Sequence, residues 1–453
     1  MKTSLIGNIF PALRPKILCL MFIWASHAVK AQDKWTLREC IDYAVQNNIA
    51  VKQQELAVEN SELELNTSLN SRLPSLNADA GQNFNFGRSP SMATGVYEPN
   101  RSASTGFSVS SSVPIFTGMR INNEIKSNRL NLMAATEGLE KARDDLSMNI
   151  ALRYLEALFK KEILKVAAEQ LALTSKQTER TETMVASEIA PRSQLYDIKA
   201  QLAGDRVSLT NAANDLALSL LNLAQLLNLE KTETFDIVEP ELHDSIVSGL
   251  LRSPDRIYET AVENRPHVKE AEYRLRSSEL GVKVAQSRYW PSISFGMSYN
   301  NGFNYVFDSG NNNSGISHQL KNNQREAIGL NMNIPVFNRF QVRNSVQAAR
   351  LNLQNRMLEL ENIRQNLQKE IRQACQSAAA AQAKYAATEE ACKAAEEALA
   401  YVEERYRVGK ATVYEFSEAQ AKLFGGRSEQ LQAKYEYIFR MKILDFYMGE
   451  KIE

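Results

Sequence analysis

The sequence predicts a mixed α+β membrane protein, built from two tandem structural repeats that combine membrane-spanning β-strands with very long helices. Three observations predict this class. The second half of the chain repeats the first at nearly constant spacing, and each half holds two alternating apolar and polar segments of about the length that crosses a bilayer as a tilted strand. The segments between them read as helices too long for a globular core.

The chain begins with the pattern of a secretory signal. Lys16 precedes an apolar run at 17–25, and small residues follow at 29–31. The apolar run is shorter than the ~20 residues that span a bilayer as a helix, which favours a cleaved signal over a membrane anchor. We therefore predict a signal peptide over 1–31 and a mature chain that starts near Gln32.

Composition excludes several classes of function. The 53 basic residues balance the 53 acidic ones, so no basic surface for nucleic acid is expected. Beyond the signal, Cys40, Cys375 and Cys392 are odd in number and widely spaced, which suits neither a disulfide framework nor a zinc site and predicts packing residues. The mature chain also lacks a run of 18 apolar residues, so a membrane location would have to come from strands.

The internal repeat defines the domains. Residues 43–47 align with 260–264 at a spacing of 217, whereas the sequence at 129–132 recurs identically at 350–353 at a spacing of 221. The four added residues lie in one Asn-rich loop, and a unit this long is a structural half rather than a solenoid repeat. The predicted division is a first repeat over 32–235, a linker over 236–253 and a second repeat over 254–453.

Four segments of about ten residues alternate with the period of two that is typical of strands. Their apolar faces carry Leu76, Ala78, Ala80, Phe84 and Phe86; Phe107, Val109 and Val113; Ile293, Phe295, Met297 and Tyr299; and Ile328, Leu330, Met332 and Ile334. The opposite faces are small and polar, like a wet lumen. A soluble antiparallel sheet alternates similarly, but bilayer-length strands in a secreted chain favour a membrane barrel. The polar segments at 88–105 and 302–325 are expected to be surface loops.

Four strands cannot close a barrel, because the smallest filled barrels need about eight. Open sheet edges in lipid would leave backbone groups without hydrogen bonds. We therefore expect the barrel to be shared between several chains.

The segments between the strands are rich in Ala, Leu, Glu, Gln and Lys and are predicted to be helical. They cover 37–72, 120–187, 193–228, 254–289, 340–408 and 412–448. At ~1.5 Å per residue, the two longest reach about 100 Å, which indicates a shaft. Heptad spacing predicts that neighbouring helices pack as coiled coils. The heptad positions are Ile150, Ala157, Leu164 and Leu171, with Ile371, Ala378, Tyr385, Cys392, Leu399 and Tyr406 in the second half.

Four prolines occupy equivalent places in the two repeats. Pro74 and Pro291 are expected between a helix and the strand that follows it, and Pro114 and Pro335 between a strand and the next helix. A missing N–H donor and a fixed φ are tolerated at such positions. A generic turn proline would be the simpler explanation, but the duplication favours a barrel-to-shaft junction.

The duplicated order, the strand ends at 113–116 and 334–337, and the turn at 405–410 together resemble the TolC-type outer-membrane efflux proteins over nearly the whole mature chain. The resemblance implies a homotrimer in which twelve strands form one barrel and the helices continue it as a periplasmic coiled-coil tunnel. It also implies an outer-membrane lipid environment, a periplasmic adaptor and an inner-membrane pump as partners, and no cofactor.

The resemblance further implies a gate near the second turn. Glu415 and Glu418 lie six and nine residues after Gly409, where the family places a ring of acids. Such rings select cations, and like charges raise each other's pKa. The alternative is that both are solvated glutamates favoured by the helix dipole. Tyr406 occupies the position of a tyrosine with which the family ties neighbouring helices.

The first turn departs from the family pattern. Glu188 stands where a glycine is usual and Gln194 where an acid is usual, while Asp197 matches Glu418 in register. Ala411 stands where an arginine link can occur. These departures leave open how the gate is locked.

Other classes of function fit less well. His243, His267 and His318 are isolated, and no phosphate-binding loop, nucleophile cluster or paired-His metal site is evident, so no enzyme and no metal site are predicted. A periplasmic coiled-coil adaptor or structural protein would explain the helices but not the strands. We predict a passive exit duct of a tripartite efflux system. Export of polypeptides by type I secretion, or of metal ions, stays open because the pump selects the cargo.

Overall fold

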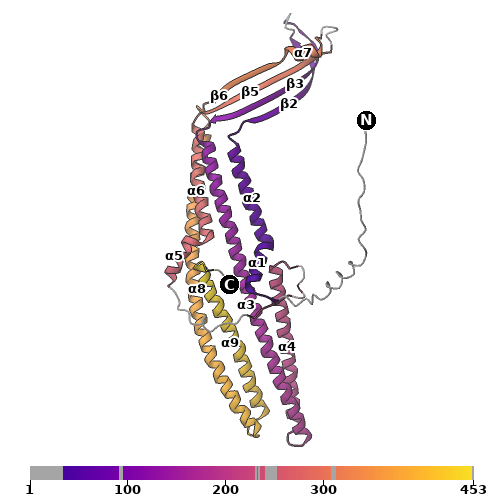
Figure 1. Cartoon of the computed structure of the whole chain (residues 1–453), viewed down its shortest axis with the longest axis vertical. Coiled ribbons are helices and arrows are strands. Elements are labelled where there is room, and N and C mark those ends of the chain that lie inside the picture. Colours follow the sequence, from indigo (N-terminus) through magenta and orange to yellow (C-terminus); the bar gives the residue numbers. More distant parts are fainter. Residues whose placement is uncertain are drawn as a thin grey trace, which may run out of the picture.

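The computed structural model describes residues 34–90, 95–229, 232, 235–239, 253–307 and 313–450. The predicted signal peptide, His243 and most of the predicted linker lie outside these residues. A curved antiparallel sheet occupies one end of the molecule, and a long helical shaft extends from it (Figure 1).

The sheet joins the two repeats. Its strands are β2 (Ser75–Pro90), β3 (Tyr97–Phe116), β5 (Ser292–Val306) and β6 (Arg325–Asn333), hydrogen-bonded in the order β2-β3-β5-β6 with every pair antiparallel. Thus the last strand of the first repeat pairs with the first strand of the second. None of the described residues covers the apolar face, on which Leu76 is 75% and Ile328 74% exposed.

Three strands are longer than the predicted ten residues, and the two loops are correspondingly shorter. β2, β3 and β5 have 16, 20 and 15 residues, so much of the segment predicted as a loop at 88–105 is strand. In the second predicted loop, β5 continues to Val306 and a short helix, α7 (Ile316–Asn322), follows. The loop prediction failed because polar residues can also form a strand when their side chains find hydrogen-bond partners. The Asn100 side chain on β3, for example, donates to the Ser89 hydroxyl on β2 at 2.9 Å.

The shaft consists mainly of two long helical hairpins. Their helices are α3 (Arg120–Ala186) with α4 (Arg192–Leu226), and α8 (Gln341–Arg407) with α9 (Val413–Tyr447). α3 and α8 each have 67 residues, and α4 and α9 each have 35, in agreement with the predicted ranges. Among the described helices, none combines the length and the hydropathy needed to cross a bilayer.

Two segments predicted as single helices are each broken in two. The observed helices are α1 (Leu37–Asn47), α2 (Ile49–Asn70), α5 (Pro254–Asn264) and α6 (Pro266–Gln286). At the first break, Asn48 is extended, and its side chain accepts from the Ala50 N–H and donates to the Leu226 carbonyl. At the second break, Pro266 lacks an N–H and disfavours the helical conformation at Arg265. The prediction of continuity over 254–289 overlooked this proline.

Arg265 links the second break to the centre of the shaft. Its buried guanidinium lies 3.0 Å from the Asp144 carboxylate on α3 and 3.5 Å from the centre of the Phe446 ring on α9. Burial raises the pKa of Asp144, and the positive charge of Arg265 opposes that rise. The ion pair joins the second repeat, which contains Arg265, to the first, which contains Asp144. Removing either residue would leave the other charge unpaired.

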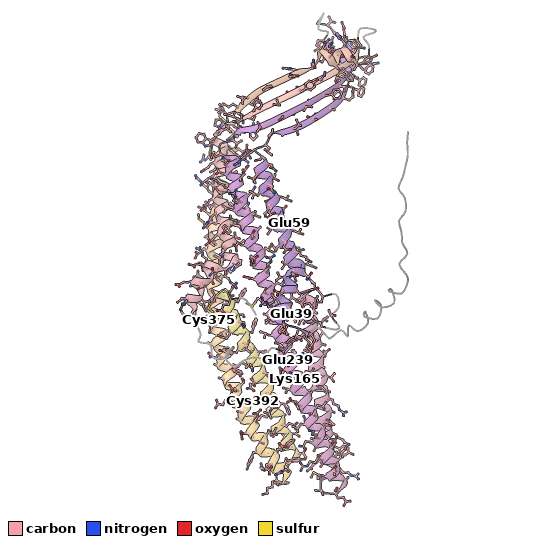
Figure 2. All side chains as sticks on the ribbon, in the orientation of Figure 1. Glu39, Glu59, Lys165, Glu239, Cys375 and Cys392 are labelled. Atoms are coloured by element: carbon pink, nitrogen blue, oxygen red, sulfur yellow. The ribbon has the colours of Figure 1, made fainter. Side chains whose placement is uncertain are left out.

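The waist of the shaft carries a second set of links. A two-residue parallel pair joins β1 (Lys34–Trp35) to β4 (Asp236–Ile237). The Tyr154 hydroxyl on α3 hydrogen-bonds the carbonyls of Trp35 and Val238. Nearby, Lys165 and Glu239 point toward one another and form an ion pair (Figure 2). These contacts fix the ends of the first repeat against the middle of α3.

The three cysteines predicted to be packing residues are free thiols and buried. Cys40 is fully buried at the waist, and Cys375 and Cys392 lie along α8 (Figure 2). Burial raises the pKa of the Cys40 thiol to about 12, so it stays protonated and unreactive at neutral pH.

Candidate gate at the tips of the helical hairpins

Each hairpin reverses through a left-handed residue at the end of the shaft opposite the sheet (Figure 1). In the second turn this residue is Gly409, with φ of 75°, and in the first turn it is Glu188, with φ of 60°. A side chain in this region costs roughly 1–2 kcal/mol, whereas glycine does not pay that cost. Glu188 thus adopts the same left-handed conformation as Gly409, although the family pattern has a glycine at its position.

Glu415 belongs to the capping box that begins α9, in which Thr412 is the N-cap residue. The Thr412 hydroxyl accepts from the Glu415 N–H at 3.2 Å, and Glu415 Oε2 accepts from the Thr412 N–H at 2.7 Å, which completes a capping box. These hydrogen bonds, from the backbone first and then from the hydroxyl, lower the pKa of Glu415 below its usual range. One carboxylate of the predicted gate is therefore held in place and ionised within a single chain.

Glu418 lies one turn farther along α9, at the edge of a hollow between α8 and α9. The hollow has a volume of about 530 Å³ and a floor of alanines, including Ala395. Four charged side chains line it: Glu415, Glu418, Arg405 and Lys422. Two acids thus face two bases, so the charge around this hollow is balanced rather than purely acidic.

Tyr406 connects three helices near the tip. Its ring stacks on the Phe416 ring of α9 at a centroid distance of 5.2 Å, and the Arg180 guanidinium of α3 lies 6.0 Å from its centroid. The contact with Arg180 joins the second hairpin to the first. These contacts tie α8 to α9 and α3 within one chain, and the part of Tyr406 in a gate stays a prediction.

Gln194 and Asp197 occupy the start of α4. They match Glu415 and Glu418 in the repeat, because α4 begins at Arg192 where α9 begins at Val413. Gln194 is half-buried and Asp197 is exposed. Among the described residues, no hydrogen bond or ion pair joins them to the two glutamates, so one chain does not bring the four together.

The four junction prolines divide into two kinds. Pro74 and Pro291 stand directly before β2 and β5, between a helix and a strand. Pro114 lies within β3, where the pairing register shifts between Pro114 and Phe116, and Pro335 lies two residues beyond the end of β6. The strand therefore continues briefly past Pro114 instead of ending there.

A buried polar cluster that sequence reasoning missed links the hairpins. Thr174 on α3 donates to Asp205 on α4 at 2.6 Å, and Gln420 on α9 donates to the Thr174 hydroxyl at 3.3 Å. All three residues are at most 3% exposed. A clue existed, since Thr174, Thr178 and Thr181 recur at spacings of four and three, as coiled-coil core positions do. Within the described part of the chain, no group of His, Cys, Asp or Glu is arranged to hold a metal ion.

The cap predicts the pH dependence of any cation selectivity that arises from Glu415. With Glu418 changed to Gln, we expect selectivity to persist as the pH falls through the ordinary glutamate pKa of about 4.3, because the pKa of Glu415 is lowered. Adding Thr412→Val removes the hydroxyl donor and should shift the loss of selectivity to higher pH. Reversal potentials in a salt gradient measure both, and identical pH profiles would contradict the prediction.

Comparison with known proteins gives a consistent picture. The sequence model of the outer membrane efflux protein family matches residues 40–229 and 257–450. The chain is 24% identical over 261 residues to the probable outer membrane lipoprotein SilC of Salmonella typhimurium, covering 56% of this chain and 52% of that protein. It is 22% identical over 425 residues to the cation efflux system protein CusC of Escherichia coli K12, covering 91% and 85%.

Solved structures share the fold. A crystal structure of CusC superposes with a TM-score of 0.76 at 19% identity, covering 92% of both chains. The outer membrane protein VceC of Vibrio cholerae superposes with a TM-score of 0.73 at 19% identity, covering 92% of this chain and 97% of that one.

Proposed function

This chain belongs to the outer membrane efflux protein family, and from that premise we propose that three copies form an exit duct that carries small solutes out of the cell. A periplasmic adaptor and an inner-membrane pump would deliver the solutes and supply the energy. The observation that carries the proposal is a sheet with an uncovered apolar face joined to a long helical shaft.

The sheet supports a barrel shared between copies. In the part of the chain that the structure describes, the outer strands β2 and β6 each pair on one side only, which leaves an edge of free backbone groups on each. In lipid those groups need hydrogen bonds, and the next copy can supply them. Three copies of four strands give twelve, which is enough to enclose a water-filled lumen.

The shaft supports conduction with a constriction at its far end. Helices of 67 residues reach about 100 Å from the sheet at ~1.5 Å per residue. The hairpin tips, with Glu415 and Glu418, lie at that distant end. Opening would then require the tips to move apart, and solutes would pass without any chemical step.

Single-channel conductance in a planar bilayer tests this function. The wild-type protein should form stable channels that favour cations. In Glu415→Ala with Glu418→Ala, Arg405 and Lys422 stay in the hollow without their acidic neighbours. We therefore expect the double variant to lose cation selectivity or to favour anions.

The matched control is Glu397→Ala with Glu429→Ala, which removes the same charge from exposed positions farther along the same hairpin. It should leave selectivity unchanged. A folded trimer that forms no channel would contradict the duct, whereas a channel that is indifferent to the tip variant would contradict only the gate.

A further inference from the structure

The long helices of the two repeats match in length and in spacing along the chain. α3 and α8 begin and end 221 residues apart, and so do α4 and α9. Within one chain, some contacts join the first repeat to the second. Shifting each contact residue by the repeat spacing gives its equivalent in the other repeat, and these equivalent residues lie on the two outer sides of the chain.

One such contact is an ion pair near the middle of α9. The Arg427 guanidinium on α9 lies 3.7 Å from the Glu169 carboxylate on α3. The residues 221 positions away are Arg206 on α4 and Glu390 on α8. Both are exposed, and among the described residues neither forms an ion pair. The repeat thus places an unpaired base on one outer face and an unpaired acid on the other.

A second contact lies nearer the sheet. The Ser277 hydroxyl on α6 donates to the Asn131 side chain on α3 at 2.6 Å. α2 precedes α6 by 217 residues, so the equivalent positions are Asn60 on α2 and Asn352 on α8. Two amides at these positions can hydrogen-bond each other as the hydroxyl and amide do within the chain.

The outer face of α2 also bears an apolar stripe. Leu56 and Leu63 are 62% and 65% exposed, one heptad apart. Their equivalents on α6, Tyr273 and Leu280, are only half-exposed because α6 packs against α3. Among the described residues, Leu56 and Leu63 on this side of α2 stay largely exposed.

We propose that adjacent copies of this chain join through a second version of the chain's own internal interface, with Arg206 of one copy paired to Glu390 of the next and Asn60 to Asn352. This rests on the proposed exit duct. In this arrangement α4 of the neighbour packs against α8 beside the alanine-floored hollow. The neighbour then contributes its α4 to the surroundings of the candidate gate.

The two seams differ in chemistry. Thr174, which accepts the Gln420 hydrogen bond across the internal seam, corresponds to Ala395, and Gln420 corresponds to Lys199. The seam between copies therefore lacks a buried polar link and offers a smooth alanine surface at that level. Specific pairing there depends on the ion pair at its edge.

Cross-linking tests the contact directly. With Cys40, Cys375 and Cys392 replaced by alanine, Arg206→Cys with Glu390→Cys is treated in membranes with a bismaleimide whose spacer matches an ion-paired Arg and Glu. Covalent dimers and trimers should appear on a denaturing gel. The control, Glu169→Cys with Arg427→Cys, should cross-link within one chain and change the mobility of the monomer only. The proposal would be overturned if the control pair cross-links and the test pair does not.

Charge exchange provides an independent readout. Arg206→Glu and Glu390→Arg should each lower the temperature at which the trimer dissociates by about 2–4 °C, and the double exchange should restore it. No restoration would overturn the pairing. Conductance of the same samples separates the two proposals: channels without the cross-link leave the duct standing, and a cross-linked trimer without channels leaves the interface standing.

Discussion

Replacing Gly118 with valine should destabilise the folded chain by about 2–5 kcal/mol, the sum of a left-handed side chain and an overpacked contact. Gly118 has φ of 61° between β3 and α3, and an added Cβ would lie 2.5 Å from the Ser287 carbonyl oxygen and 2.7 Å from Trp290 Cβ. Neither neighbour can turn away as a flexible side-chain end could. Chemical denaturation of the purified protein and the yield of trimer in membranes measure the effect.

Gly409→Ala is the matched control. Gly409 has φ of 75° but open space around an added Cβ, so it pays only the backbone cost. The fold tolerates that cost, since Arg339 stands at the position equivalent to Gly118 with φ of 53°. A Gly118 variant that is no less stable than the control would show that the junction of the repeats is looser than the contact implies.

Asp205→Ala should destabilise the shaft by about 2–4 kcal/mol, because buried donors lose their acceptor. The Asp205 carboxylate accepts from the Thr174 hydroxyl at 2.6 Å and from the side chains of Gln170 and Gln201 at 2.8 and 3.0 Å. Thermal unfolding monitored by circular dichroism measures the loss. Asp205→Asn should cost less, since its remaining oxygen still serves the two glutamines.

A double-mutant cycle with Thr174→Ala tests whether the cluster acts as a unit. Once Asp205 is alanine, removing Thr174 should cost less than it does alone, with a coupling of about 0.5–3 kcal/mol. Additive effects would mean that the two side chains contribute separately. The cycle also reports on the link to the second hairpin, because Gln420 donates to Thr174 and has an unbonded buried oxygen of its own.

The pH and conductance predictions depend on the same local feature. The capping box at Thr412 keeps Glu415 ionised, whereas Arg405 and Lys422 balance the charge of the hollow. A ring of acids predicted from position alone would miss that balance. The net field at the constriction therefore depends on how the copies arrange both signs of charge.

By itself, the sequence determined the architecture. The repeat spacing of 221 fixed equal lengths for the long helices, and the alternation near Leu76 and Ile328 identified strands with an uncovered apolar face. Local rules are sufficient here because helix length follows from uninterrupted helix-forming residues, and strand faces follow from a period of two. The same rules account for the break at Pro266, because proline lacks the N–H that a continuous helix needs.

Only the tertiary structure decided which side chains meet. The pairing of Thr174 with Asp205 and Gln420 joins segments 31 and 246 residues apart. The stacking of Tyr406 on Phe416 and the bases beside Glu418 depend on how α8 and α9 pack across their turn. Periodicity gives a residue its face but not its neighbour, because the neighbour depends on how separate helices pack and at which register. The extra length of β2, β3 and β5 also depends on tertiary structure, because each strand continues as far as its neighbour pairs with it, whatever its own composition.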